Sequence, residues 1–168
     1  MGYGPGASLK LWTDFLPTSE ISFVEYDADC AEKHRKSIEE KGRGKLYVGD
    51  QSNVTFLNRI IEDQGGRVFD VIIDDGGHTM EQQKTTMSHL WQLVAPGGIF
   101  VMEDLLTSYM PGYGGGPKGH PGTMIEMHKQ MLDGLHCQFQ DNCVPVLEGL
   151  LDMDCFSEAC VMVKQPAA

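Results

Sequence analysis

Two apolar stretches of the chain each end in side chains that could bind a metal ion and move a proton. The first stretch ends in Asp75 and leads through two glycines to His78. The second delivers Glu103 and Asp104 as consecutive acids. If the two stretches are neighbouring strands of a parallel sheet, three carboxylates and an imidazole meet at one carboxyl edge. The pattern predicts a metal site with a base beside it.

Each of these side chains also has a purely structural interpretation. Asp74 or Asp75 could cap a helix that begins near Thr79, and one of the two is expected to do so. His78 could be a solvated turn residue, and Glu103 could be an ordinary acid at a strand end. An apolar strand that delivers two consecutive carboxylates is costly, however, unless a cation neutralises them. The acids therefore favour the metal interpretation.

Strands alternate with helices along the chain, which is the signature of βαβ units in a parallel sheet. Apolar periodicity and glycine or proline breaks place helices at residues 8–15, 28–41, 54–64, 80–94 and 123–135. The same signals place strands at residues 20–26, 45–48, 68–74, 99–102, 150–156 and 159–163. A tight turn joins the last two strands, which are expected to finish the sheet as an antiparallel pair. The sequence predicts one α/β domain over residues 1–168.

Residues 105–122 form a long, irregular, glycine-rich segment. A segment of this kind in a compact domain is usually a lid or substrate loop, and a mobile solvent loop is the alternative. Tyr109, Tyr113, His120 and Glu126 are candidates for contacts with an acceptor molecule. The sequence leaves both interpretations open.

The composition narrows the class of partner. The 168 residues carry 13 basic and 24 acidic side chains, for a formal net charge of −11, which argues against binding to nucleic acid. The chain has neither an apolar run long enough for a membrane span nor a signal-peptide core. We expect a soluble, cytoplasmic protein with a small-molecule partner and no membrane partner. A homo-oligomer stays open.

The five cysteines are odd in number and lack the paired short spacing of a zinc site. Buried or free thiols are therefore expected. A metal site at Cys137 and Cys143, near His136, is the less favoured alternative.

A glycine turn at the start of the chain, with Gly2, Gly4 and Gly6, stands where a first strand should end and a helix begin. In nucleoside-binding folds such glycines let the backbone approach the ligand, and an acid at the end of the next strand binds the ribose hydroxyls. Glu25 has that position, and Asp50 ends the following strand. These acids favour a nucleoside site over an ordinary turn. The nicotinamide fingerprint is not met, since alanine stands at its final glycine position.

Six segments of the chain carry a family resemblance: GYGPGASLKLW, FVEYD, VGDQS, FDVIIDDGGH, LVAPGGIFVMEDLLTSY and GTMIE. Together they resemble the class I S-adenosylmethionine-dependent methyltransferases. They are most similar to the metal-dependent O-methyltransferases of macrolide sugars, the mycinamicin and macrocin type. The resemblance covers residues 1–130 and is most specific at DDGGH and ED. It implies a Rossmann-like three-layer αβα fold with a mostly parallel seven-stranded sheet and an antiparallel last strand.

The resemblance also implies residue roles. For S-adenosylmethionine it implies that the methionine part is surrounded by Gly2, Gly4, Gly6 and Ser8. It also implies that Glu25 holds the ribose and that the adenine lies near Asp50 and Gln51. For Mg²⁺ it implies the ligands Asp75, Glu103 and Asp104. His78 matches the general base that removes a proton from a metal-bound hydroxyl, whose alkoxide then attacks the sulfonium methyl.

One departure from the family concerns the start of the chain. Compared with the family, whose members begin earlier, the first strand of the sheet, which should precede Gly2, is expected to be missing from this sequence. A central strand is buried on both faces, so the chain resembles an N-terminally truncated fragment. The expected function is S-adenosylmethionine-dependent, Mg²⁺-dependent O-methylation of a hydroxyl of a small natural product. The alternatives are a catalytically inactive methyltransferase-like binding module and, less favoured, a nicotinamide-dependent reductase.

Overall fold

The structure is a computed structural model that describes residues 7–137, 143 and 145–167. The chain forms two compact units, residues 1–56 and 57–168. The expected glycine turn of Gly2, Gly4 and Gly6 lies outside the described residues. A single domain over residues 1–168 stays a prediction.

The first unit is built on two parallel strands. Its elements are α1 (Ala7–Phe15), β1 (Ile21–Glu25), α2 (Ala28–Ser37), the π-helical turn η1 (Ile38–Gly42) and β2 (Arg43–Val48). Glu25 is in register with Val48, and the next amide, Gly49 N–H, donates to the Glu25 carbonyl oxygen at 2.9 Å. The two strands therefore end at the same edge, as the βα pattern predicted. The predicted helix over residues 28–41 is confirmed as α2 followed by η1.

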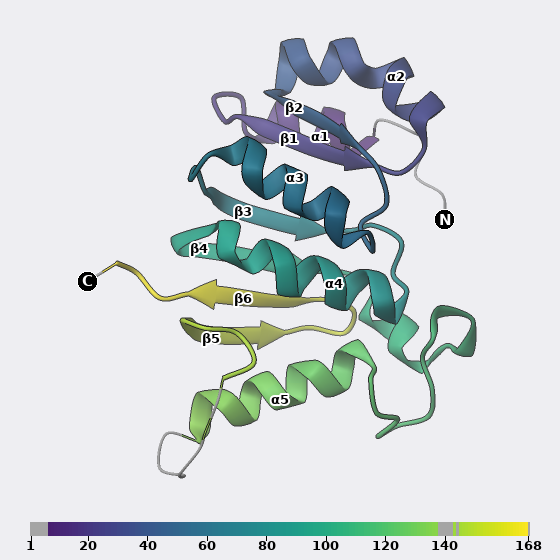
Figure 1. The fold of residues 1–168 in the computed structure, drawn as a ribbon, viewed down its shortest axis with the longest axis vertical. Helices are drawn as coiled ribbons and strands as arrows, with labels where there is room; N and C mark the ends of the chain where they lie inside the picture. The colour runs from purple at the N-terminus through teal and green to yellow at the C-terminus, as the bar shows by residue number, and fades with distance from the viewer. Residues whose placement is uncertain (1–6, 138–142, 144, 168) are drawn as a thin grey trace. The chain divides into compact units, whose positions relative to one another are not determined.

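The second unit contains a four-stranded sheet in the order β3-β4-β6-β5 (Figure 1). β3 and β4 are parallel, whereas β6 is antiparallel to both β4 and β5. Three of its strands thus run in one direction, and only the last strand in the chain runs in the other, as expected. The strands are β3 (Phe69–Asp74), β4 (Val94–Met102), β5 (Leu150–Cys155) and β6 (Cys160–Lys164).

Helices and buried apolar side chains accompany this sheet. In Figure 1, α4 (Met80–Leu90) crosses in front of the sheet and α5 (Met124–His136) lies beside β5. The third helix, α3 (Val54–Gln64), precedes β3. None of the helices in the described part of the chain is long and apolar enough to cross a membrane. The largest fully buried apolar side chains are those of Leu57, Met87, Val94, Phe100, Met102, Met124, Met131 and Met162.

The connection from α4 to β4 differs from the prediction. The helix ends at Leu90 and continues as a 3-10 turn over Trp91–Leu93, and β4 already begins at Val94. The register between β3 and β4 shifts between Phe69 and Val71. Phe69 pairs with Val94 and Val71 pairs with Ile99, so the extra residues of β4 before Ile99 form an irregularity. A Cβ at Gly98 would lie 2.8 Å from the Asp70 carbonyl oxygen, so glycine permits the close approach of the strands.

The segment after β4 is folded onto itself. It contains the 3-10 helices η3 (Leu105–Tyr109) and η4 (Pro111–Tyr113). Gly116 N–H donates to the Ser108 carbonyl oxygen at 3.0 Å, and the buried Ser108 Oγ accepts from Ile125 N–H at 3.2 Å. Among the candidate acceptor contacts, Tyr109 and Tyr113 stay exposed. Whether they contact an acceptor stays a prediction.

The cysteine prediction was wrong for four of the five residues. Cys155 is the direct partner of Cys160 across the β5–β6 pair, with a Cα–Cα distance of 4.1 Å, and the two form a disulfide. Cys137 and Cys143 form a second disulfide, with a Cα–Cα distance of 5.7 Å. Only Cys30 is a free thiol. The sequence spacing did not reveal which cysteines lie opposite one another.

Candidate active site

The ends of β3 and β4 bring three of the expected site residues together. At this edge Glu103 N–H donates to the Asp74 carbonyl oxygen at 3.0 Å, so the two strands stay paired up to the residues that follow them. Asp75 continues from β3, Asp104 continues from β4, and the loop after β3 carries His78. One ligand atom from each of these last three residues lies within 4.8 Å of the other two.

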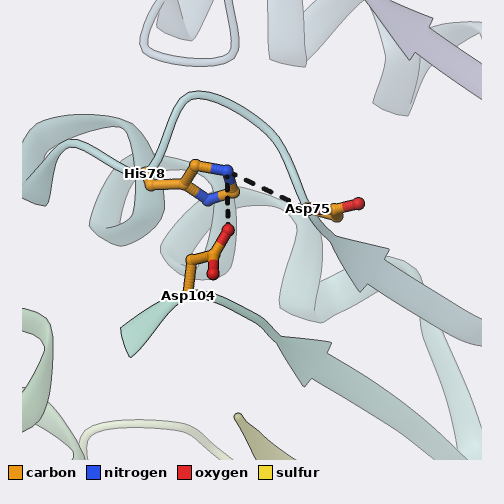
Figure 2. A group of neighbouring side chains, drawn as sticks. All are labelled: Asp75, His78 and Asp104. Carbon is orange, nitrogen blue, oxygen red and sulfur yellow. Dashed lines mark ion pairs between the residues drawn. The ribbon is translucent and has the colours of Figure 1, made fainter. Parts of the chain in front are cut away.

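The imidazole is directed at both carboxylates. Figure 2 shows Nε2 of His78 turned toward Asp104 and Asp75, at 3.1 Å from Asp104 Oδ2 and 3.9 Å from Asp75 Oδ1. The side chains of His78, Asp104 and Asp75 are 18%, 41% and 54% exposed. The imidazole is thus largely enclosed, while the carboxylates remain open to a ligand or to water.

Glu103 lies beside this group without being a member of it. Its carboxylate is half-buried, and burial is the main cause that raises its pKa. The negative charges of Asp75 and Asp104 raise that pKa further, and His78 opposes them. Glu103 is therefore close enough to interact with the group electrostatically. Its role as a metal ligand stays a prediction.

The acids at this edge disfavour one another's charge. Burial raises the pKa of Asp75, the charge of Asp104 adds to the rise, and His78 counteracts both. Carboxylates that are partly desolvated and close to like charges are stabilised by a nearby cation. The electrostatics of this edge therefore favour occupation by a positive ion.

Two residues of the group have a strained backbone. His78 has a φ of 58° and Asp104 a φ of 53°, which places both in the left-handed region that non-glycine residues rarely adopt. Such a conformation costs roughly 1–3 kcal/mol and persists only where the surroundings enforce it. Strain of this kind concentrates at functional sites, so it supports a functional role for this edge.

A capping box at the start of α4 fixes the loop that carries His78. Thr79 is the N-cap, Gln82 N–H donates to Thr79 Oγ1 at 3.2 Å, and Thr79 N–H donates to Gln82 Oε1 at 3.2 Å. The Gln82 amide packs directly against Gly77, where a Cβ would overlap with it. Glycine at this position therefore lets the capping amide lie beneath the loop.

The expectation that Asp74 or Asp75 caps the helix was wrong. Thr79 caps α4, and the signal for it was present in the sequence, since Thr79 and Gln82 have the spacing of a capping box. The buried Asp74 instead accepts from Gly76 N–H at 3.2 Å, which tightens the turn after β3. Gln82 and its neighbour on α4, Gln83, were not among the site residues predicted from the sequence.

The candidate cofactor residues belong to the first unit. Glu25 ends β1, and its Oε1 accepts from Asp27 N–H at 2.9 Å. Asp50 follows β2 and accepts from both Ser52 N–H and Ser52 Oγ at 2.8 Å, and Gln51 comes next in the turn. The acids thus lie after neighbouring parallel strands, where nucleoside ligands bind in open α/β sheets.

Ser8 and Gly49 are two further residues of the first unit that concern the candidate cofactor site. Ser8 is exposed in the first turn of α1. At Gly49, just before Asp50, a Cβ would lie 2.6 Å from ring carbons of Phe56. Glycine at this position therefore allows the aromatic ring to pack against the turn.

The donor set of the second unit fits Mg²⁺. This ion prefers oxygen ligands and keeps several coordination positions for water or substrate, and the carboxylates of Asp75 and Asp104 are partly exposed. Imidazole is a poorer ligand for Mg²⁺ and a good proton acceptor near neutral pH. The arrangement can therefore combine a hard cation with a base at His78.

Known proteins are similar to this chain in both sequence and fold. A family model described as a methyltransferase domain matches residues 1–105. Mycinamicin VI 2''-O-methyltransferase from Micromonospora griseorubida is 36% identical over 135 residues, which is 79% of this chain and 32% of that protein. A tetracenomycin-C 3'-O-methyltransferase from Streptomyces olivaceus, which acts on a 2-methoxy-rhamnosyl derivative, is 38% identical over 133 residues, 78% of this chain and 32% of that protein.

A solved structure extends the similarity to nearly the whole chain. The MycE methyltransferase of the mycinamycin biosynthetic pathway, in complex with Mg, SAH and mycinamycin VI, superposes with a TM-score of 0.81 at 29% identity. The superposition covers 99% of this chain and 42% of that one. Of the curated relatives it matches, the chain spans about a third of the length.

The fold is that of the Rossmann-like αβα methyltransferases, as expected. This chain belongs to the methyltransferase domain family, whose model covers more than half of its residues.

Proposed function

We propose that the chain supplies the catalytic part of an O-methyltransferase that uses S-adenosylmethionine and Mg²⁺ to methylate a hydroxyl of a small natural product. The observation that carries this proposal is the convergence of Asp75, His78 and Asp104 at the end of β3 and β4. Family membership and the relatives' names support the reaction type. A solved relative that contains Mg and SAH supports the cofactors.

In this proposal the first unit binds S-adenosylmethionine. Glu25 would accept hydrogen bonds from the ribose hydroxyls, as acids at this strand end do in nucleoside sites. Asp50 and Gln51 would lie near the adenine, and Ser8 with Gly2, Gly4 and Gly6 would surround the methionine part. These roles rest on the positions of the residues in the family pattern and on the strand ends described above.

The second unit would hold the metal and the base. Asp75 and Asp104, with Glu103 beside them, would be the Mg²⁺ ligands. When bound, Mg²⁺ lowers the pKa of a hydroxyl that coordinates it. His78 would accept the hydroxyl proton, and the nearby Asp104 carboxylate would stabilise the resulting imidazolium. The deprotonated oxygen would then attack the methyl carbon of S-adenosylmethionine as its carbon–sulfur bond breaks, which would release S-adenosylhomocysteine.

The relatives' names support a proposal for the acceptor class. They describe O-methylation of mycinamicin VI and of a rhamnosyl derivative of tetracenomycin-C. We therefore propose a sugar hydroxyl of such a molecule as the acceptor, with Tyr109, Tyr113, His120 and Glu126 as candidates for contacts.

The test is methyl transfer by the purified chain. The chain is incubated with S-adenosylmethionine labelled on the methyl group and with mycinamicin VI, in three samples that contain MgCl₂, EDTA, or EDTA followed by excess MgCl₂. We expect label in the product with Mg²⁺, its loss with EDTA and its return with added Mg²⁺. In parallel, calorimetry measures binding of S-adenosylhomocysteine and of Mg²⁺.

The outcomes separate this proposal from its alternative. Binding of S-adenosylhomocysteine without any Mg²⁺ binding, and without transfer to mycinamicin VI or a panel of glycosylated hydroxyl acceptors, would support the inactive binding module instead. Methyl transfer that is equally fast in EDTA would contradict the role of the metal while leaving the methyltransferase activity in place.

A further inference from the structure

Gln83 is buried beside the end of β4. Its side chain is 0% exposed, and its Nε2 donates to the Glu103 carbonyl oxygen at 2.9 Å. Its Oε1 is also buried and has no hydrogen-bond partner among the described residues. The side chain therefore makes one directed contact, and that contact is with the strand end that carries two of the proposed metal ligands.

This burial is difficult to explain by stability alone. A buried amide oxygen without a partner costs free energy, because the hydrogen bonds it made to water are lost. An apolar side chain of similar volume could fill the same space without that cost. The side-chain amide of Gln83 is therefore better explained by the hydrogen bond that its N–H group donates to the Glu103 carbonyl oxygen.

The hydrogen bond restrains the peptide that leads into Asp104. The carbonyl of Glu103 belongs to the peptide unit that joins Glu103 to Asp104, and the amide of Glu103 is already paired with β3. On the other side, the Asp104 carbonyl accepts from Thr107 N–H at 3.1 Å and from Thr107 Oγ1 at 2.8 Å. The strained residue Asp104 is thus held by fixed peptides on both sides.

The next residue is also anchored. Leu105 N–H donates to the Glu158 carbonyl oxygen at 2.9 Å, in the turn between β5 and β6. Of the contacts around Asp104, the bond from Gln83 acts on the preceding peptide plane, whose orientation sets φ of Asp104. If this bond is lost, the peptide can rotate and Asp104 can relax out of the left-handed region.

We propose that Gln83 is a positioning residue that keeps the Asp104 carboxylate directed toward His78 and the metal. The inference rests on the proposed function, because it assigns Gln83 to the same metal site. Gln83 itself contacts neither the metal nor the acceptor in this account. It acts through the peptide between Glu103 and Asp104.

The test measures metal binding by the full chain with Mn²⁺, which prefers the same octahedral oxygen coordination as Mg²⁺. Free Mn²⁺ is counted by electron paramagnetic resonance during a titration of wild-type protein and of Gln83→Met, which keeps the length of the side chain and removes the donor. We expect Mn²⁺ affinity to fall by about tenfold or more in Gln83→Met. Affinity for S-adenosylhomocysteine should stay at the wild-type value.

Met87→Ala is the matched control. Met87 lies one turn further along α4 and is fully buried, so its truncation destabilises the same helix without removing a contact to Glu103. Met87→Ala should lower the unfolding temperature more than Gln83→Met does, and its Mn²⁺ affinity should match the wild type. This pairing separates positioning from general stability.

Two binding results would overturn the inference. One is an unchanged Mn²⁺ affinity in Gln83→Met, and the other is an equal loss in Gln83→Met and Met87→Ala. If Gln83→Met does not fold, Gln83→Leu takes its place, and failure of both to fold would also overturn the inference, because Gln83 would then be required for folding. If the wild type binds no Mn²⁺, the metal site of the proposed function is contradicted. If the wild type binds Mn²⁺ and Gln83→Met binds it equally well, only the role of Gln83 is contradicted.

Discussion

His78 and Asp104 face one another across the ends of two neighbouring strands, with Nε2 of His78 3.1 Å from Oδ2 of Asp104, and both have left-handed backbones. Each conformation alone costs free energy, and together they direct an imidazole and a carboxylate at the same point. The capping box beneath His78 and the hydrogen bonds around Asp104 hold the pair in place.

The first prediction concerns the base. His78→Ala should reduce methyl transfer by roughly 10²–10⁴-fold, because the proton of the acceptor hydroxyl then has no positioned acceptor. The rate is measured at saturating S-adenosylmethionine and Mg²⁺, with the acceptor that supports wild-type turnover. His136→Gln, at an exposed helix end, is the control and should keep the wild-type rate. A His78→Ala rate within a few-fold of wild type would remove His78 from the reaction.

The second prediction concerns the metal ligands. Asp104→Asn keeps the side-chain shape but removes a charge, so Mg²⁺ affinity measured by calorimetry should fall at least tenfold, by about 1.4 kcal/mol or more. Affinity for S-adenosylhomocysteine should not change. Asp70→Asn, at an exposed position earlier on β3, is the matched control and should bind Mg²⁺ like the wild type. Equal loss of both ligands in Asp104→Asn would indicate a structural role for Asp104.

The third prediction concerns the loop before His78. A methyl group at position 77 would displace the Gln82 amide from its capping bonds, so Gly77→Ala and Gln82→Ala should each destabilise the chain by about 1 kcal/mol, as the loss of a cap does. The double variant should cost little more than either single variant, because both remove the same contact. Chemical denaturation of the four proteins measures this coupling. Fully additive effects would show that Gly77 and Gln82 act independently.

The fourth prediction concerns pH and His128 on α5. Burial lowers the pKa of His128, and the hydrogen bond between its Nδ1 and the Met124 carbonyl oxygen, at 2.9 Å, opposes that effect. In the unfolded chain a histidine has a pKa of about 6.5. Because the folded pKa is lower, the unfolded state takes up the proton first as pH falls, so stability is full above about pH 6.5 and is lost below it.

This pH dependence can be isolated by substitution. The unfolding temperature of the wild type should drop between about pH 7.5 and pH 5, and His128→Met should reduce the size of that drop. His136→Gln should retain it, since that imidazole is exposed. An identical pH profile in the wild type and His128→Met would show that His128 does not titrate differently on folding.

The order of elements and the edge that carries the acids could be predicted from the sequence, because these features are local. Apolar runs with glycine breaks marked β3 and the end of β4, and consecutive acids after them marked the edge where Asp75 and Asp104 meet. The antiparallel last strand was also correct. The predicted start of β4, at residue 99, was wrong, because the strand begins at Val94. The irregular residues before Ile99 pair only in the context of β3.

The fine geometry of the site could not be predicted, because it depends on contacts between distant residues. The left-handed backbone of Asp104 and the position of Glu103 beside the group are set by partners on other elements. The bond from Gln83 joins residues twenty positions apart and leaves no local signal. The cysteine pairs were missed for a different reason, since they are local: Cys155 and Cys160 are five positions apart, on two strands that were predicted to pair, and lie opposite one another.

The most direct test of the metal site is anomalous diffraction from crystals of this chain grown with S-adenosylhomocysteine and MnCl₂. The account predicts an anomalous peak at Mn²⁺ coordination distance from the carboxylates of Asp75 and Asp104, with His78 beside it. A fully soaked crystal with no peak at this edge, or with its peak elsewhere, would contradict the account.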